Sequence, residues 1–301
     1  MSLQFVADGL VMGALIGLGA IGVTLTYSIL RFANFAHGEF LAWGTYLALA
    51  LCAGIAALTG GTATIGALSF GWPLIVAGLA AAAFTGLLAL ALDRILFAKL
   101  RGQGNAIVMV MASFGASMAL RSLLEFLFTS EPHYFSRDIQ IALPLVFGIR
   151  LTPDQLFLLG LTALLVVVME GFMTRSATGR AMRAVSENPV LARVAGVDVE
   201  GVIRATWMIG AALACAAGIM LGLTVQIRPF MGFDLLLPLF AAAILGGIGS
   251  VPGAVLGGLI VGLGEAAAVQ WIGAEYRAAV AFLILIAVLL LRPAGLFGMR
   301  A

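Results

Sequence analysis

Residues 173–204 read MTRSATGRAMRAVSENPVLARVAGVDVEGVIR and separate two long apolar runs of the chain. The segment holds five arginines and only three acids, so it is basic. The flanking runs, 153–172 and 204–226, are each long enough to cross about 30 Å of hydrocarbon as a helix. A basic loop between two such runs belongs on the cytoplasmic side of a membrane. The segment therefore predicts a polytopic helical membrane protein and orients it.

Composition agrees with this prediction. The chain has 301 residues, of which 62% are hydrophobic and 10% are charged, whereas soluble domains carry about a quarter charged residues. A net charge of +2 is too small to indicate a nucleic-acid partner. No polar stretch is long enough for a separate catalytic or nucleotide-binding domain. We expect one transmembrane domain over 1–301, with 173–204 as its cytoplasmic loop.

The transmembrane segments follow from apolar runs at 8–29, 37–58, 72–97, 105–128, 153–172, 204–226 and 275–291. Residues 235–272 are long enough for two passes, but Pro238 and the break GGIGSVPG at 246–253 interrupt them. This pattern predicts either two short helices that meet at a bend or a re-entrant pair, buried against protein. The expected fold is an all-α bundle of about eight to nine transmembrane helices.

The basic residues predict the orientation of these segments. Those expected in the cytoplasm are Arg31, Arg94, Lys99, Arg101, the arginines of 175–204, Arg292 and Arg300. Loops 59–71 and 129–152 are then outside. The N-terminus is outside and the C-terminus inside if 235–272 crosses twice. Because no Lys or Arg precedes Arg31, we expect the first run to be a retained span and not a cleaved signal peptide.

A short amphipathic helix is predicted within the basic loop. Asn188 suits an N-cap, Pro189 the first helical position and Gly196 the position after the last turn. The apolar face of this helix consists of Leu191, Val194 and Ala195. A capped, half-apolar helix in a cytoplasmic loop indicates a contact with a cytosolic partner.

Polar residues at the ends of the runs allow two interpretations. Asn34 can cap the helix that follows, with Glu39 near its positive end, which leaves His37 without an assigned role. Alternatively, Asn34, His37 and Glu39 line a translocation path or fix a gate. Arg121 and Glu125 lie four residues apart and can pair on one helix face.

Glycines give a second set of alternatives. In the break, Gly247, Gly249 and Ser250 are further candidates for the path or gate. Elsewhere, small residues recur at a spacing of four, which lets helix backbones approach closely in lipid. These residues are Gly9, Gly13, Gly17, then Gly253 with Gly257, and Gly258 with Gly262. The spacing indicates either tight bundle packing or an interface that slides during conformational change.

Catalytic patterns are missing from the sequence. The two histidines, His37 and His133, are expected on opposite sides of the membrane, and no metal-binding histidine motif occurs. Neither a Gly-x-Ser-x-Gly elbow nor a Walker loop is present. Cys52 and Cys215 lie in apolar runs and are interpreted as small core residues. We therefore predict no catalytic residue, metal ligand or cofactor.

Three blocks of the sequence resemble the permeases of bacterial branched-chain amino-acid ABC transporters. The first block, at 9–48, contains the string NFAHGE at 34–39, the second is the loop at 179–199, and the third comprises 240–266 with RPAGLFG at 292–298. The blocks cover nearly the whole chain in the family's order. The early position of NFAHGE resembles the LivH type.

The resemblance implies one permease subunit of a binding-protein-dependent importer in the bacterial cytoplasmic (inner) membrane. It implies a second related permease, two cytoplasmic ATPase subunits and an extracytoplasmic solute-binding protein as partners. The implied substrates are branched-chain or related amino acids. The residues placed at the ATPase contact are Arg180, Arg183, Glu187, Asn188, Pro189, Leu191, Val194, Ala195 and Gly196.

Two other classes of function are alternatives to an importer permease. A self-contained secondary transporter or channel would use the broken segment 246–253 as its solute site, and it needs intramembrane acids as coupling groups. Glu125, Glu170 and Glu265 are the candidates, all near the ends of spans. A membrane enzyme is disfavoured because no base and nucleophile lie within reach of each other.

Overall fold

A computed structural model of the protein describes residues 3–60, 64–102, 105–136, 140–144, 148–292 and 294–297. Pro293 and Gly298 of the RPAGLFG string, and Arg300, which was expected in the cytoplasm, lie outside the described residues.

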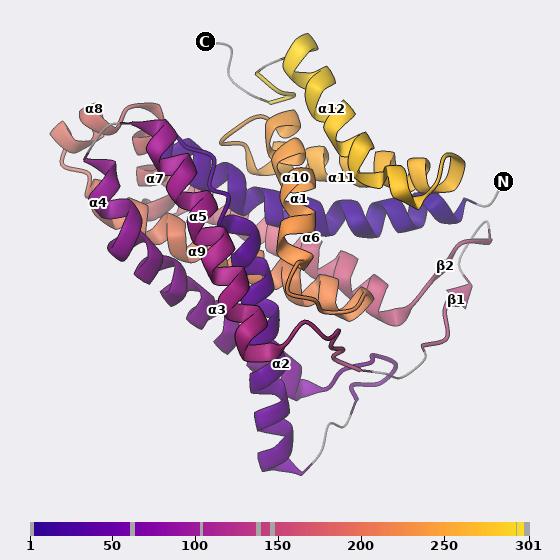
Figure 1. Ribbon diagram of the computed structural model, residues 1–301. Helices are drawn as coiled ribbons and strands as arrows, with labels where there is room; N and C mark the ends of the chain where they lie inside the picture. The colour runs from indigo at the N-terminus through magenta and orange to yellow at the C-terminus, as the bar shows by residue number, and fades with distance from the viewer. Residues whose placement is uncertain are drawn as a thin grey trace.

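Helices account for almost all of the regular structure (Figure 1). In chain order they are α1 (Gln4–Leu30), α2 (His37–Thr59), α3 (Trp72–Leu92), α4 (Ala98–Arg101), α5 (Ala106–Phe128), α6 (Pro153–Arg175), α7 (Ala177–Glu187), α8 (Pro189–Val194), α9 (Val199–Thr224), α10 (Met231–Gly246), α11 (Val251–Trp271) and α12 (Arg277–Leu291). A π-helical stretch, Asp93–Phe97, joins α3 to α4, and a 3₁₀ turn, Ala274–Tyr276, precedes α12. Two short strands, β1 (Leu143–Pro144) and β2 (Arg150–Leu151), pair antiparallel.

The prediction of an all-α polytopic membrane protein is confirmed. Within the described residues, eight helical segments are long and apolar enough to cross a membrane, and α10 is a ninth, shorter apolar helix of 16 residues. α10 and α11 are separate helices that pack on each other and meet at a non-helical turn over 247–250. The alternative of two helices meeting at a bend is therefore the one observed. Pro238 lies inside α10 and does not end it.

α1 lies at the centre of the bundle, where it packs against α11, α9 and α10. Its contact with α11 brings backbone against backbone. A Cβ on Gly13 would lie 2.7 Å from Leu259 Cα, and one on Gly17 would lie 3.1 Å from Val255 Cα. The contacts descend along α11 as they ascend along α1, so the two helices are antiparallel. Tight bundle packing, the first of the two interpretations of the glycine spacing, describes this interface.

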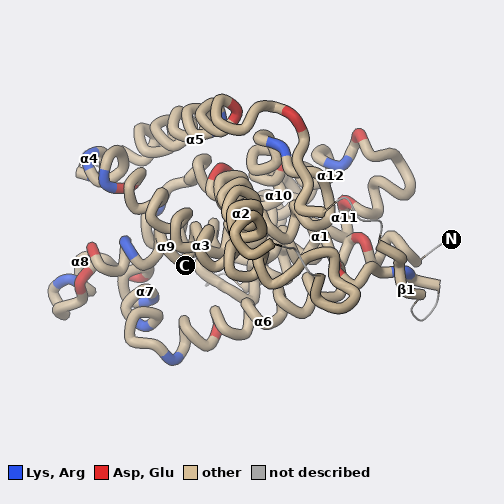
Figure 2. The backbone as a smooth tube through the Cα atoms, turned by 90° about the horizontal axis from the view of Figure 1, so that it is seen from below, with Lys and Arg blue, Asp and Glu red and all other residues tan. Residues whose placement is uncertain are grey.

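Contacts between loops agree with the predicted sidedness. The Arg31 guanidinium after α1 donates to the Ser186 and Glu187 carbonyls at the end of α7, at 3.2 and 3.1 Å. Arg101, at the end of α4, lies 3.5 Å from Glu200 at the start of α9. All of these residues were expected in the cytoplasm. Figure 2 shows charged residues gathered around α4, α7 and α8, at the opposite end of the molecule from β1.

The loops expected outside likewise contact one another. The Gln4 side-chain amide donates to the Arg150 carbonyl at 2.9 Å. His133 and Ile227 exchange backbone hydrogen bonds of 2.9 and 2.8 Å. Two sets of loops, each confined to one end of the bundle, are what alternating spans require. The C-terminal segment joins the inner set, because the Leu296 amide donates to the Leu245 carbonyl at 2.8 Å.

α2 does not start at the inner end of the bundle. After α1 ends at Leu30, residues 31–36 are non-helical and partly buried, and they run back along α5. The Phe35 amide donates to Ser113 Oγ at 3.1 Å, seven residues along α5, or about 10 Å from its start. Non-helical backbone at this depth is tolerated only where protein or water surrounds it. The start of α2 is therefore an interior feature of the bundle.

Gly13→Val should prevent stable folding, because its Cβ would meet the α11 backbone, and overpacking a close-packed contact costs about 1–3 kcal/mol or more. Gly160→Val, on α6 where a Cβ meets nothing within 4 Å, is the matched control. The measurement is the yield of monodisperse protein in mild detergent. Equal yields of the two variants would contradict the packing argument.

Orientation is tested with introduced cysteines in a Cys52→Ala background, in which the remaining native Cys215 is buried. Ser130→Cys, in the exposed loop after α5, should react with a membrane-impermeant thiol reagent on intact cells. Ala195→Cys, exposed after α8, should react only after the membrane is opened. The reverse pattern would place the basic loop outside and overturn the topology.

Candidate functional site

α8 lies at the edge of the bundle, at the end where charged residues gather around α4 and α7 (Figures 1 and 2). Val190, Leu191 and Val194 are 72%, 65% and 80% exposed, although each is a large aliphatic residue. Only Ala192 of this helix is buried. We name Val190, Leu191 and Val194 the α8 patch. Exposed aliphatic residues on a short, projecting helix are typical of a docking surface.

Local hydrogen bonds define both ends of α8. Asn188 Oδ1 accepts from the backbone amides of Val190 and Leu191, at 3.1 and 3.0 Å. Pro189 occupies the first turn, where its missing N–H costs nothing. Gly196 has φ +86°, a left-handed conformation that favours glycine. The predicted cap, first residue and terminating glycine are confirmed, and Ala195 follows the last helical residue and is exposed.

α7 packs against the bundle and anchors the loop that carries α8. Its buried residues Met182 and Val185 pack into the main core, while Gly179 lies against the backbone at Met173. The candidates Arg180, Arg183 and Glu187 all lie on α7 and are all exposed. Because Arg31 binds carbonyls at the end of α7, the loop that carries the α8 patch is tied to the inner end of α1.

The interior polar residues form a second group. Asn34, His37 and Glu39 are 4%, 1% and 1% exposed. Asn34 Oδ1 accepts from the Ala36 amide at 3.1 Å, so it caps the turn before α2, while Ala36 stands at the N-cap itself. His37 packs against Gly22 of α1. Asn34 Nδ2, His37 Nε2 and Glu39 Oε2 have no hydrogen-bond partner within the described chain.

The Glu39 carboxylate links α2 to α5 through hydrogen bonds to α5 side chains. Its Oε1 accepts from Ser117 Oγ at 2.9 Å and from Arg121 Nη2 at 2.8 Å. The Arg121 guanidinium also lies over the rings of Phe233, at 4.3 Å, and Phe230, at 5.0 Å. The predicted pairing of Arg121 with Glu125 is wrong, because the buried carboxylate of Glu39 offers a stronger, desolvated partner than an acid at the helix surface.

Two glycines allow α2 and α10 to start side by side. A Cβ on Gly38 or on Gly232 would overlap the carbonyl of the other residue, so the two backbones are in contact. This places the N-terminal ends of both helices beside the Glu39–Arg121 pair. The sequence showed each glycine but gave no sign that they meet, because they are 194 positions apart in the chain.

The non-helical turn between α10 and α11 lies at the other end of α10 from Gly232. Gly247 and Gly249 have φ +97° and +91°, and the Gly249 amide donates to Thr24 Oγ1 of α1 at 2.7 Å. Ser250 caps α11 by accepting from the Gly253 amide at 3.1 Å. Gly247 is 15 residues after Gly232 along α10, or about 22 Å. The six residues predicted for the path or gate therefore form two groups, and both contact α1, His37 at Gly22 and Gly249 at Thr24.

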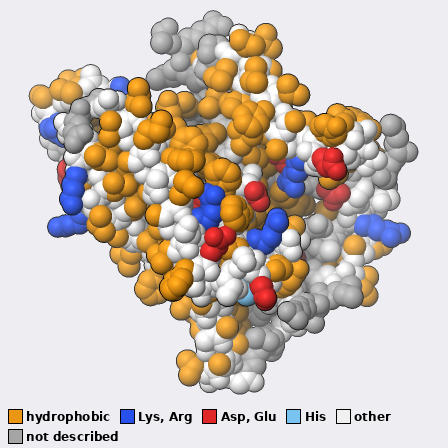
Figure 3. Space-filling model, in the orientation of Figure 1, with side chains coloured by type: hydrophobic (Ala, Val, Ile, Leu, Met, Phe, Trp, Pro, Cys, Tyr) orange, Lys and Arg blue, Asp and Glu red, His pale blue; other side chains and the backbone are white. Residues whose placement is uncertain are grey.

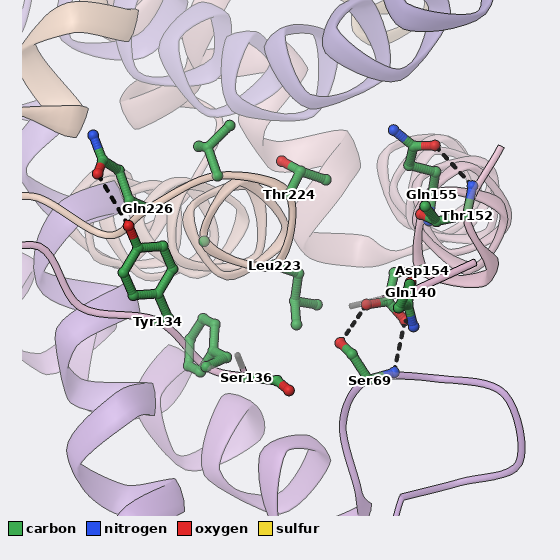
Figure 4. A pocket seen from close by; sticks show the side chains of 13 residues that line it. Ser69, Tyr134, Ser136, Gln140, Thr152, Asp154, Gln155, Leu223, Thr224 and Gln226 are labelled. Carbon is green, nitrogen blue, oxygen red and sulfur yellow. Dashed lines mark hydrogen bonds between the residues drawn. The ribbon is translucent and has the colours of Figure 1, made fainter. Parts of the chain in front are cut away.

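A polar cavity of about 290 Å³ opens among the loops expected outside, and no sequence motif predicted it (Figure 4). One wall is held by Asp154, which accepts from the Ser69 amide at 3.0 Å, from the Ser69 hydroxyl, and from Gln140 Nε2 at 2.9 Å. On the other wall Tyr134 donates to Gln226 at 3.3 Å. Its walls come from α6, α9 and three loops, so only the folded chain assembles it.

Comparison with known proteins identifies the family. Residues 5–289 match the family model described as branched-chain amino acid transport system / permease component. The chain belongs to this permease family. It is 33% identical to the high-affinity branched-chain amino acid transport system permease protein LivH of Escherichia coli K12, over 98% of the chain and 95% of LivH. It is 34% identical, over the same shares, to the BraD permease protein of Pseudomonas aeruginosa.

Similarity to solved structures is weaker. The chain PsaBC from Streptococcus pneumoniae, in complex with Fab, matches with a TM-score of 0.49 and 12% identity over 98% of this permease and 94% of that chain. Family membership confirms the resemblance drawn from the three sequence blocks, and the relatives are transport permeases.

Glu39→Gln should destabilise this permease markedly. It would leave the Arg121 guanidinium, only 11% exposed, without its carboxylate, and breaking a buried pair from one side costs about 3–5 kcal/mol. The control is Glu131→Gln, an exposed acid just beyond α5. Thermal unfolding of the purified protein in detergent is the measurement. Equal midpoints for the two variants would contradict a stabilising role for the pair, and Glu39→Gln with Arg121→Gln should recover part of the loss.

Proposed function

We propose that this chain is a permease subunit of an ABC importer in the bacterial inner membrane and forms half of a path for branched-chain or related amino acids. A second related permease completes the path, two cytoplasmic ATPase subunits drive it, and an extracytoplasmic binding protein delivers the solute. Its relatives over almost their full length are named as permeases of high-affinity branched-chain amino-acid transport systems, which supports this assignment.

The α8 patch is the single structural observation that supports the assignment most directly. A permease driven by separate ATPases needs a cytoplasmic contact that transmits movement into the membrane. Leu191 and Val194 are exposed apolar anchors on a capped helix, as expected for a helix that docks in a groove. The same loop is bound to the inner end of the central helix α1 through Arg31.

A secondary transporter is less well supported. Such a protein needs intramembrane acids that can exchange protons or ions. Glu39 and Glu265 are paired with Arg121 and Arg277, at 2.8 and 2.6 Å, and Asp93 is paired with Arg101. Acids already neutralised by arginine are poor coupling groups, and Glu265, one of the three candidate acids, is such a group.

The importer proposal is tested by reconstitution. The chain should copurify in mild detergent with a second permease and an ATPase from its own cells. Proteoliposomes of that complex should accumulate leucine only with ATP and the binding protein. ATP-independent uptake, or uptake by this chain alone, would instead support a secondary transporter.

Leu191→Asp combined with Val194→Asp should leave the protein inserted and folded but abolish ATP-dependent uptake, because two charges replace the apolar anchors of the proposed ATPase contact. Arg193→Gln is the matched control, since it lies on α8 and is exposed but is not an apolar anchor. ATPase copurification and leucine uptake are both measured. Normal values for the double variant would refute docking through α8.

A further inference from the structure

A group of charged side chains lies in the middle of an otherwise hydrophobic face of the molecule, over α5 and α10 (Figure 3). We define the α5–α10 face by Arg121, Arg228, Phe230, Phe233 and Asp234. Arg228 and Asp234 lie 3.8 Å apart, and their side chains are 50% and 57% exposed. Phe230 and Phe233 are 47% and 41% exposed. Arg121 lies beneath these two rings and is 11% exposed, so it forms the floor of the face.

The α5–α10 face lies within the span of the bilayer, and this depth indicates what its exposed charges face. Arg121 is seven residues before the end of α5, or about 10 Å below its outer end. Phe233 lies on the Arg121 guanidinium, and Asp234 follows it in the first turn of α10, so both share this depth. Charged groups within the span of the bilayer almost always face protein or a water-filled path. The α5–α10 face is therefore turned away from lipid.

The chemistry of the face matches a small zwitterion with an apolar side chain. The edge of Arg121 that is not bound to Glu39 offers guanidinium N–H donors for a carboxylate. α10 starts here without a side-chain cap, and the N-terminal end of its helix dipole adds positive potential at the same point. Asp234 offers a carboxylate for an ammonium group. Phe230 and Phe233 offer apolar surface between the two charges.

We propose that the α5–α10 face lines the translocation path and contacts the amino acid directly, with Arg121 facing its carboxylate, Asp234 its ammonium group and the two phenylalanines its side chain. The proposal rests on the proposed function and specifies the solute contacts within it. The Glu39 pair and the contact of Gly38 with Gly232 hold Arg121 and the first turn of α10 in place.

The test uses proteoliposomes of the complete transporter with saturating binding protein and leucine. Asp234→Asn should lower the uptake rate about tenfold or more, since a hydrogen bond to a charged group contributes about 1.5–3 kcal/mol. ATPase stimulation by the binding protein should persist, because the α8 patch is untouched. Glu275→Gln, an exposed acid before α12, is the matched control and should transport normally.

A charge exchange separates solute contact from a local ion pair. The double variant Arg228→Asp with Asp234→Arg keeps an opposite pair at 228 and 234 but places a cation where the ammonium group would bind. Uptake should stay low. Full recovery by the exchange, or normal uptake by Asp234→Asn, would overturn the proposal.

Thiol labelling distinguishes two interpretations of the α5–α10 face, a solute path and a surface covered by the second permease. In a Cys52→Ala background, Phe233→Cys should react with a membrane-impermeant thiol reagent during turnover, whereas Leu164→Cys, exposed on α6, should react only with a lipid-soluble one. Failure of Phe233→Cys to react in any state would overturn the path. If the unmodified complex took up no leucine, the proposed function would fail, and this labelling would still report on the path.

Discussion

The close approach of α1 and α11 is the contact on which the rest of this bundle depends. Glycines on α1 meet the α11 backbone at intervals of four residues, so the two helices lie closer than side chains would allow. In lipid, association of helices depends on such packing because hydrocarbon offers no hydrophobic gain. With α1 fixed in the centre, α9 and α10 pack around it. These helices then position the interior polar residues and the cytoplasmic loop.

A second constraint acts at the start of α2. Residues 31–36 leave the inner end of α1 and return into the bundle without helical hydrogen bonds. Such a segment is stable only when it is surrounded by protein or water, and here it lies along α5. Its consequence is that Glu39 lies beside Arg121, at a depth where neither charge is stable alone. The irregular segment and the buried pair thus stabilise one another.

The two proposed sites, the α8 patch and the α5–α10 face, lie at different depths of the bundle. At the cytoplasmic end, α8 is exposed, apolar and tied through Arg31 to α1. Toward the outer half, charged and aromatic side chains of α5 and α10 form one uncovered face. The central helix α1 packs against both α7, which precedes α8, and α10. In the proposed importer, α1 connects the ATPase contact to the α5–α10 face.

The sequence by itself determined what depends on neighbours along the chain. Apolar runs predicted the spans, and the cap at Asn188 with the glycine at 196 predicted α8, because capping and helical periodicity act within a few residues. Only the tertiary structure decided which distant groups meet. Glu39 could be given a local role as easily as a partner on α5, and Arg121 had an acid four residues away that it does not use. The separation of Gly249 from Glu39, the contact of Gly38 with Gly232 and the outer cavity likewise follow from how the helices pack, since local hydrogen-bonding rules carry no information about which helix lies beside which.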